Sequence, residues 1–251
     1  MRTISIMNQK GGVGKTTSSI NIGAGLAKLG RKVLLLDLDP QAHLSYSLGL
    51  QAHELPSTMY EVLRGKTDLS LILVEKDGLW IAPSSLNLSA ADIELASLPG
   101  REFLLLEALE NVKGYDVLLV DCPPNLGLLS INAMTATREI FIPLQTEFLA
   151  LQSLGKILET VQTVKRRLNK HLEVTGIICT RYSRQKRLNR EVVQKIQEYF
   201  GDKLFETKIR ENIALAEAPS FGQDIFHYRP DSHGAEDYLS LCKEIIQRGE
   251  S

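Results

Sequence analysis

Apolar residues in this chain occur in two kinds of segment, which alternate along its length. Short segments rich in β-branched residues are apolar at nearly every position, and such continuous runs are typical of strands buried on both faces of a sheet. These runs cover residues 2–7, 32–38, 79–82, 115–121, 139–143, 174–180 and 204–209. They therefore predict a mainly parallel sheet.

Longer segments with helical periodicity separate the predicted strands. They cover residues 15–29, 102–112, 149–168, 189–200 and 235–247. Because strands and helices alternate over the whole length, the pattern predicts an α/β fold with one doubly wound parallel sheet flanked by helices. No linker-like or repetitive tract interrupts the alternation, so we expect a single domain over residues 1–251.

Composition excludes several classes of protein. The 251 residues are 43% hydrophobic and 24% charged, which is typical of a globular chain with a full core. The three cysteines lie far apart and in no metal-binding or disulfide spacing, as suits a protein of the reducing cytosol. No run of eighteen apolar residues occurs, so we expect no membrane span. The net charge of −1 means that nucleic acid would have to bind at a local basic patch.

A glycine-rich loop stands between the first predicted strand and the first predicted helix. Residues 8–17 read Asn-Gln-Lys-Gly-Gly-Val-Gly-Lys-Thr-Thr. Glycines let backbone N–H groups turn inward, and the helix N-terminus adds positive potential, so the loop predicts a nest for the β- and γ-phosphates of a nucleotide. Lys15 would supply a point charge, and the Thr16 hydroxyl would be a ligand for Mg²⁺. Gln9 replaces the usual first glycine, and a second lysine, Lys10, stands early in the loop.

Three aspartates stand at the ends of predicted strands. Asp37 and Asp39 end the strand at 32–38, and Asp121 ends the strand at 115–121. A carboxylate beside a phosphate loop can hold Mg²⁺ through water or orient an attacking water. An isolated aspartate at a strand end is more often a turn or helix cap, but three beside such a loop favour a chemical role.

The loop with two lysines is the deviant Walker A motif, and the chain resembles the ParA-type (Soj-like) partition ATPases of the MinD/ParA superfamily. Besides the loop, the matching segments are 36–41, 119–124, 147–151, 215–222 and 232–238. The resemblance implies a P-loop NTPase fold, ATP and Mg²⁺ as cofactors, and a homodimer that forms with ATP. It also implies non-specific DNA binding and slow ATP hydrolysis that a ParB-like protein stimulates.

The resemblance implies catalytic roles for Lys10, Lys15 and Asp39. Lys15 would bind phosphate, and Asp39 would orient the hydrolytic water. Lys10 would reach across a nucleotide sandwich dimer to the phosphates held by the other subunit. A lysine delivered in this way would neutralise charge at the γ-phosphate as an arginine finger does, which would make dimerisation depend on that phosphate.

The resemblance also implies the remaining ligand contacts. Asp121 would support the Mg²⁺ ion from behind its ligand Thr16, Gly11 would lie at the dimer seam, and Asn212 would contact adenine. The predicted nucleotide-binding residues are Lys10, Gly11, Gly12, Val13, Gly14, Lys15, Thr16, Thr17 and Asn212.

The chain departs from the family pattern at two places. After residues 39–41 the family usually continues with Gly-Asn, whereas this chain has Ala42 and His43. The DNA-binding arginines of Soj-like members correspond to Gln185 and Ala214, which carry no charge. We expect Ala42 and His43 to affect the rate of ATP turnover, and Gln185 and Ala214 to affect the binding of DNA.

Basic residues nevertheless crowd the region before the helix predicted at 189–200. Clustered cations can follow a phosphate backbone through counterion release without reading bases, so we expect DNA to bind there. The alternative is a solvated face in which cations complement a helix dipole. The predicted DNA-binding residues are Arg181, Arg184, Lys186, Arg187 and Arg190.

Together these features predict a cytoplasmic, nucleoid-associated ATPase that partitions a plasmid or chromosome region. One alternative is a related ATPase that positions a protein cargo on the nucleoid through a different partner. Another is a switch that acts on proteins without binding DNA, which Gln185 and Ala214 favour. An iron–sulfur reductase relative is excluded because paired bridging cysteines are missing.

Overall fold

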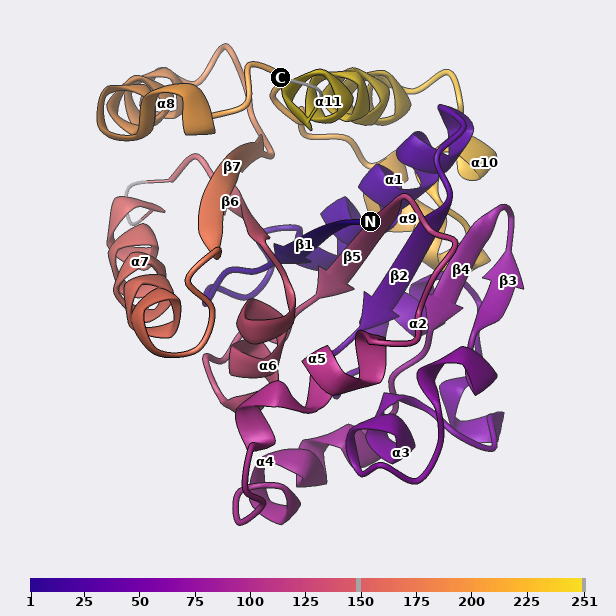
Figure 1. Ribbon diagram of the computed structural model, residues 1–251. Helices are drawn as coiled ribbons and strands as arrows, with labels where there is room; N and C mark the ends of the chain where they lie inside the picture. Colours follow the sequence, from indigo (N-terminus) through magenta and orange to yellow (C-terminus); the bar gives the residue numbers. More distant parts are fainter. Residues whose placement is uncertain (148–149, 250–251) are drawn as a thin grey trace.

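The computed structural model describes residues 1–147 and 150–249, and its strands form one seven-stranded sheet (Figure 1). The strand order is β3-β4-β2-β5-β1-β6-β7, and every neighbouring pair is parallel except β3 with β4. The strands are β1 (Arg2–Ile6), β2 (Val33–Asp37), β3 (Val74–Lys76), β4 (Leu79–Ala82), β5 (Val117–Asp121), β6 (Glu139–Gln145) and β7 (Glu173–Thr180). The predicted mainly parallel, doubly wound sheet is therefore confirmed.

Helices cover both faces of the sheet. Figure 1 shows α1, α9, α10 and α11 on one side, and α3, α4, α5 and α6 on the other. The α-helices are α1 (Lys15–Lys28), α2 (His43–Ser47), α3 (Met59–Leu63), α4 (Ala91–Glu94), α5 (Leu104–Leu109), α6 (Leu128–Ala136), α7 (Ala150–Arg167), α8 (Arg187–Phe200), α9 (Ala214–Glu217), α10 (Ile225–Tyr228) and α11 (His233–Gly249). Within the described ranges, no helix combines the length and apolar character needed to cross a membrane.

Successive residues of the central strands pack into two separate cores. In β2, Leu34 and Leu36 belong to the core beneath α5, α6 and α7, whereas Val33 and Leu35 belong to the core beneath α1 and α11. All four side chains are fully buried. A strand covered on both faces needs apolar residues at every position, which explains the continuous runs in the sequence.

Two glycines allow α1 to lie close to its neighbours. A Cβ atom at Gly23 would stand 2.7 Å from Cδ2 of Leu35, and one at Gly25 would stand 2.5 Å from Sγ of Cys242 in α11. A side chain at either position would push α1 away from the sheet or from α11. This close packing holds α1, the helix that follows the glycine-rich loop, against the sheet and α11.

The five predicted helices are present, with ends shifted by a few residues. The helix expected at 149–168 is α7, and residue 149 lies outside the described residues, as does residue 148 of the segment 147–151. The helix expected at 102–112 is shorter, because residues Arg101–Phe103 form a 3₁₀ turn before α5.

The edge strand β3 is not among the predicted strands, although the chain carries a signal for it. Asp77 and Gly78 join β3 to β4, with φ angles of 51° and 79°. Two adjacent residues with positive φ form the turn that suits a two-residue hairpin, and Asp-Gly is a preferred sequence for it. The β3 segment itself, Val74–Lys76, is too short to produce an apolar run.

The strand predicted at 204–209 is wrong. Among the described residues of this segment, only Leu204 forms a bridge, with Ile177 of β7. The backbone N–H groups of Glu206 and Thr207 donate to the carboxylate of Glu244 on α11, at 2.7 and 3.0 Å. Because a side chain of a helix satisfies these donors, the segment does not need a continuous ladder with β7.

Candidate nucleotide-binding site

The glycine-rich loop lies at the middle of the sheet edge where the parallel strands end. It joins β1 to α1, and β1 is flanked by β5 and β6. Gly12 and Gly14 have φ angles of 73° and 88°, in the region that glycine adopts without steric cost. Ligand sites of open α/β sheets lie beyond the carboxyl ends of the strands, so the loop occupies the expected place.

Hydrogen bonds to two neighbouring strands hold the loop in position. The Asn8 amide donates to the carbonyl of Pro143 at 2.7 Å, and its oxygen accepts the backbone N–H of Lys10 at 3.0 Å. The Thr180 hydroxyl at the end of β7 donates to the carbonyl of Val13 at 2.8 Å. The loop is thus tied to β6 and β7 as well as to its own strand.

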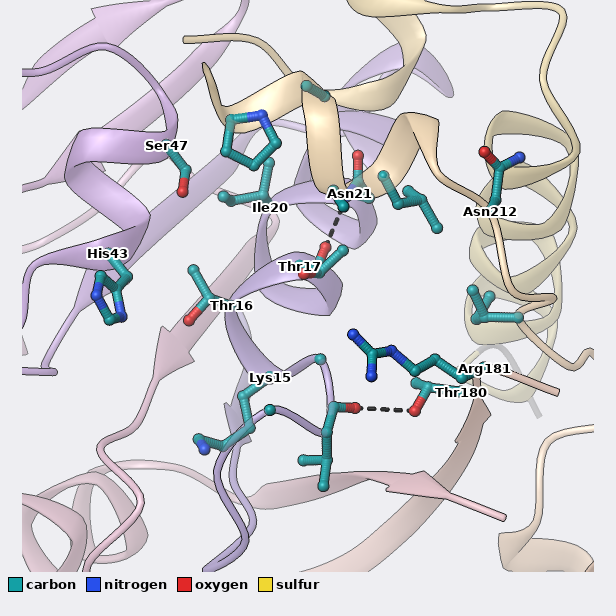
Figure 2. Close-up of a pocket in the computed structure, with 18 of the residues that line it drawn as sticks. Lys15, Thr16, Thr17, Ile20, Asn21, His43, Ser47, Thr180, Arg181 and Asn212 are labelled. Carbon is teal, nitrogen blue, oxygen red and sulfur yellow. Dashed lines mark hydrogen bonds between the residues drawn. The ribbon is translucent and has the colours of Figure 1, made fainter. Parts of the chain in front are cut away.

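The loop forms one wall of a cavity of about 790 Å³ (Figure 2). This volume suits a ligand of nucleotide size. The segment after β2, the end of β7 and the region from 209 to 219 supply the other walls. The predicted site residues that line the cavity are Gly11, Gly12, Val13, Gly14, Lys15, Thr16, Thr17, Asp39, Arg181 and Asn212.

Asp121 at the end of β5 binds two hydroxyl groups of α1. Thr16 Oγ1 donates to Oδ2 of Asp121, and Ser19 Oγ donates to Oδ1, both at 2.8 Å. Because the Thr16 hydroxyl is the donor in its hydrogen bond to Asp121, the lone pairs of its oxygen remain available to a cation. Burial raises the pKa of Asp121 to about 6, against the lowering effects of both hydrogen bonds and of the Lys15 charge.

Asp37 is the last residue of β2 and Asp39 lies in the loop after it, but only Asp39 lines the cavity. The Asp37 carboxyl is fully buried and accepts the backbone N–H and the hydroxyl of Ser45, at 2.9 and 2.7 Å. Burial, followed by the charge of Asp121, raises the pKa of Asp37 to about 8. Asp37 therefore holds the start of α2, whereas Asp39 is placed to meet a ligand.

The segment after Asp39 contains a non-glycine residue in a left-handed conformation. Oδ1 of Asp39 accepts the backbone N–H of Gln41 at 3.0 Å, and Ala42 then has a φ of 52°. The chain enters α2 at His43, whose side chain lines the cavity near Thr16 (Figure 2). Of the two residues that depart from the family pattern here, His43 thus lies in the cavity wall and Ala42 does not.

The two lysines of the loop lie in different places. Lys15 is 8% exposed, and its Nζ lies 3.5 Å from the carbonyl oxygen of Lys10. Lys10 does not line the cavity, and its Nζ pairs with Oε2 of Glu147 at 2.5 Å. Both side chains of this pair are about half exposed. The ammonium group of Lys10 therefore lies outside the cavity.

Asn212 reaches the cavity from the segment before α9. Its side-chain oxygen accepts the backbone N–H of Ala214 at 2.9 Å, so the start of this short helix fixes the side chain. Figure 2 shows Asn212 across the cavity from the glycine-rich loop. The segment also exposes the side chain of Ile213, which lines the cavity and is 72% exposed.

The five predicted DNA-binding residues fall into two groups. Arg181, with a φ of 48°, lines the cavity beside Thr180 (Figure 2). The others are exposed around the start of α8: Arg184, Lys186, Arg187 and Arg190. Two of these pair with acidic neighbours, Arg187 with Glu191 at 2.7 Å and Lys186 with Glu211 at 3.4 Å.

The sheet, the glycine-rich loop and the Thr16–Asp121 contact define a P-loop nucleoside triphosphatase fold of the deviant Walker A type. A family model described as an AAA domain matches residues 1–174. The chain is 42% identical to the sporulation initiation inhibitor protein Soj of Bacillus subtilis, covering 99% of both chains. It is 45% identical to the chromosome-partitioning ATPase Soj of Treponema pallidum, covering 98% of both. The chain therefore belongs to the ParA-type partition ATPases of the MinD/ParA superfamily.

Solved structures show the same fold over nearly the whole chain. Cobyrinic acid a,c-diamide synthase of Mycobacterium smegmatis, solved with ADP and magnesium, is 33% identical with a TM-score of 0.88, covering 100% of this chain and 96% of that one. The septum site-determining protein MinD of Pyrococcus horikoshii, complexed with Mg-ADP, is 28% identical with a TM-score of 0.78. That match covers 97% of this chain and 95% of the other.

Proposed function

We propose that this chain is a single-domain, ATP-dependent dimerising ATPase that binds DNA non-specifically. With a ParB-like partner it would partition a chromosome region or plasmid, as a cytoplasmic protein associated with the nucleoid. The observation that carries the proposal is the joint placement of Lys15, Thr16 and Asp39 around one cavity, with Asp121 directly behind Thr16. Membership of the partition ATPase family supports it.

The residues around the cavity fit ATP with Mg²⁺. The backbone of the loop and the Lys15 ammonium would hold the β- and γ-phosphates. The Thr16 oxygen, oriented by its hydrogen bond to Asp121, would be the protein ligand of Mg²⁺. When bound, the metal ion neutralises charge on the phosphates. The related folds solved with magnesium and ADP support this assignment.

Asp39 is the group that would orient the hydrolytic water. One carboxylate oxygen accepts the N–H of Gln41, which fixes the side chain and leaves the other oxygen for a water molecule. Asp39 lines the cavity, whereas the neighbouring Asp37 faces Ser45 in the interior. The geometry therefore favours Asp39 over Asp37 for this role.

Lys10 is the group that would act across a dimer. Its pair with Glu147 is exposed, and exposed ion pairs contribute only about 0–1 kcal/mol. Exchange of this carboxylate for a phosphate in another subunit would therefore cost little. Since the γ-phosphate carries much of the negative charge, ATP would favour the closed dimer more than ADP does.

The exposed cations around the start of α8 would bind DNA in the closed dimer. Arg184, Lys186, Arg187 and Arg190 lie on one short stretch, and their partial pairing with glutamates leaves charge available for phosphates. A second candidate function, a switch that acts on a protein partner without DNA, is favoured by Ala214. This residue is 1% exposed and uncharged where Soj-like members have a DNA-binding arginine.

The proposed ATPase cycle is tested by sedimentation velocity and phosphate release with ATP and Mg²⁺. The wild-type protein should be a monomer with ADP, a dimer with ATP, and a slow ATPase. Lys15→Ala should lose nucleotide binding, the ATP dimer and phosphate release, because the phosphates lose their buried cation. Equal ATP affinity in this variant and the wild type would contradict the assignment of the loop.

A further inference from the structure

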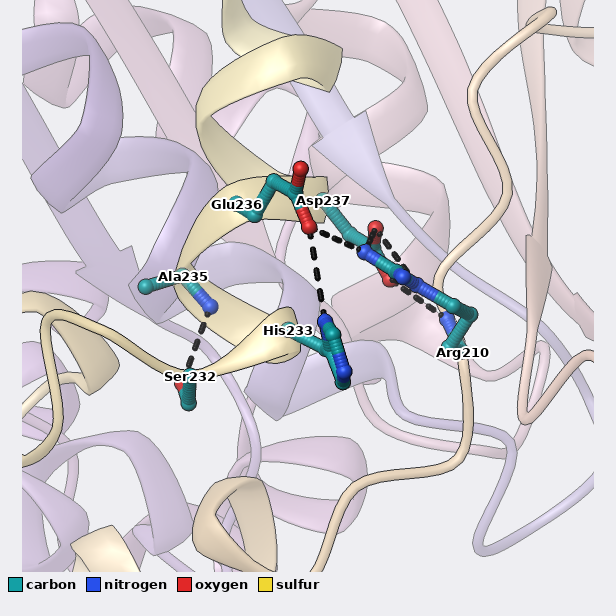
Figure 3. A network of polar contacts seen from close by, with 6 residues as sticks. All are labelled: Arg210, Ser232, His233, Ala235, Glu236 and Asp237. Carbon is teal, nitrogen blue, oxygen red and sulfur yellow. Dashed lines mark hydrogen bonds and ion pairs between the residues drawn. The ribbon is translucent and has the colours of Figure 1, made fainter.

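Arg210 connects the cavity wall to α11 through Asp237 (Figure 3). The guanidinium donates to Oδ1 of Asp237 from Nη2 at 2.6 Å and from Nε at 3.0 Å. The backbone N–H of Arg210 also donates to Oδ2 of Asp237, at 2.8 Å. The Asp237 side chain is only 9% exposed, so one nearly buried carboxylate binds both the main chain and the side chain of Arg210.

A second carboxylate reinforces the contact from the outside. Oε2 of Glu236 accepts from Nη2 of Arg210 at 2.6 Å and lies 3.4 Å from Nδ1 of His233. These two residues are exposed, so their contribution is screened by solvent. Asp237, rather than Glu236, is therefore the principal anchor of Arg210.

The anchored segment carries Asn212, which lies across the cavity from the glycine-rich loop (Figure 2). Before the anchor, Ile209 is tied to the end of β7, where its N–H donates to the carbonyl of Cys179 at 2.9 Å. After Arg210 the segment leaves the sheet and continues to Asn212 and the exposed Ile213, both in the cavity wall. The Asp237 contact thus ties the segment to α11 before these two residues, and after them Ala214 and Ala235 of α11 share a buried apolar cluster.

We propose that Asp237, acting through Arg210, is a positioning residue that sets the base-side wall of the nucleotide cavity. The inference rests on the proposed nucleotide-binding function. Asn212 and Ile213 offer an amide and an apolar face, which suit the edge and the flat surface of a nucleobase. Both can act only if the backbone that carries them is held in place. The residue after Asp237, Tyr238, also lines the cavity, and its hydroxyl forms a hydrogen bond with the hydroxyl of Ser18 in α1. Helix α11 therefore contacts both the Arg210 segment and α1.

Glu244 provides a matched control on the same helix. Two turns after Asp237, its carboxylate accepts the backbone N–H groups of Glu206 and Thr207 and so anchors an earlier part of the same segment. Neither of these two residues lines the cavity. A purely structural role of α11 carboxylates predicts the same outcome for Asp237 and Glu244, whereas a role in base positioning predicts different outcomes.

The test compares ADP with inorganic tripolyphosphate, each with Mg²⁺, by isothermal titration calorimetry. Arg210→Met and Asp237→Asn should each weaken ADP binding about tenfold, and tripolyphosphate binding less than twofold, because only ADP reaches the base-side wall. The double variant should bind ADP about as weakly as either single variant, since both remove one interaction. Glu244→Gln should lower the melting temperature without changing either affinity.

The inference would be overturned by unchanged ADP affinity in both variants, or by an equal loss of affinity for ADP and tripolyphosphate. Equal losses of ADP affinity in Glu244→Gln and Asp237→Asn would assign the contact a purely structural role. Failure of the proposed function gives a different result, because the wild-type protein would then bind neither probe.

Discussion

Asp37 and Asp121 are register partners at the carboxyl ends of β2 and β5, and both carboxyl groups are fully buried. Burial is the main cause of the raised pKa values of both, about 8 for Asp37 and about 6 for Asp121. The charge of Asp121 further raises the pKa of Asp37. Of the two carboxyl groups, Asp37 is therefore the one whose ionised form is disfavoured more strongly.

This pair predicts that the ligand-free protein loses stability as the pH rises from 6 to 8. In that range Asp37 has lost its proton in the unfolded chain, where its pKa is near 3.8, but keeps it in the folded protein. The free energy of unfolding should then fall by on the order of 1 kcal/mol per pH unit through this group. Urea denaturation at pH 6, 7 and 8 measures the slope.

Asp37→Asn is the control for the pH dependence. It removes the titrating group, so the slope between pH 6 and 8 should flatten even if the variant is less stable at every pH. Asparagine keeps only one of the two oxygens that accept the Ser45 donors and the N–H of Asp39, which explains a uniform loss of stability. An equally steep slope in wild type and variant would show that Asp37 does not keep its proton in the folded protein.

The placement of Lys10 outside the cavity predicts a separation of binding from dimerisation. Lys10→Ala should bind ADP within about twofold of wild type, because its ammonium lies at Glu147 and not in the cavity. The same variant should form no dimer with ATP and should lose hydrolysis. Calorimetry with ADP and sedimentation with ATP measure the two steps. A Lys10→Ala dimer of wild-type affinity would show that the lysine does not act across subunits.

The left-handed conformation of Ala42 predicts that its replacement by glycine has little effect on the free energy of unfolding. Its φ of 52° costs an L-residue about 1–2 kcal/mol, and glycine removes that strain. The lost methyl contact and the greater freedom of unfolded glycine oppose this gain, so Ala42→Gly should change the free energy of unfolding by less than about 0.5 kcal/mol. Ala52, which is equally buried, has no positive φ, and Ala52→Gly should cost about 1 kcal/mol. Equal losses in urea denaturation would contradict strain at Ala42.

The parts of the site that the sequence predicts well depend on local patterns. The loop around Lys15 follows a strand and precedes a helix, so its position at the sheet edge follows from chain order. Asp39 and Asp121 end neighbouring strand regions and therefore lie near the same edge. Asn212 could be placed only by resemblance, because nothing in its immediate surroundings indicates a ligand contact.

Contacts between segments far apart in the sequence could not be predicted from local patterns. Arg210 and Asp237 are separated by 27 positions, and their contact depends on how α11 lies along the segment from 204 to 213. The same packing explains the incorrect strand at 204–209, where Glu244 on α11 takes backbone donors that a sheet would use. Apolar periodicity reports burial, but it does not report which partner satisfies the backbone.

The most direct test of the account is DNA binding by the Asp39→Ala protein with ATP and Mg²⁺, measured over a series of salt concentrations. This variant should stay in the ATP-bound dimer because the hydrolytic water loses its orienting group. We expect retention on non-specific DNA that needs ATP and weakens with salt. A variant that also changes Arg184, Lys186 and Arg187 to alanine should dimerise normally and lose retention. Absence of DNA binding at low salt, with the dimer confirmed, would contradict the proposed function and favour a switch that acts on a protein partner.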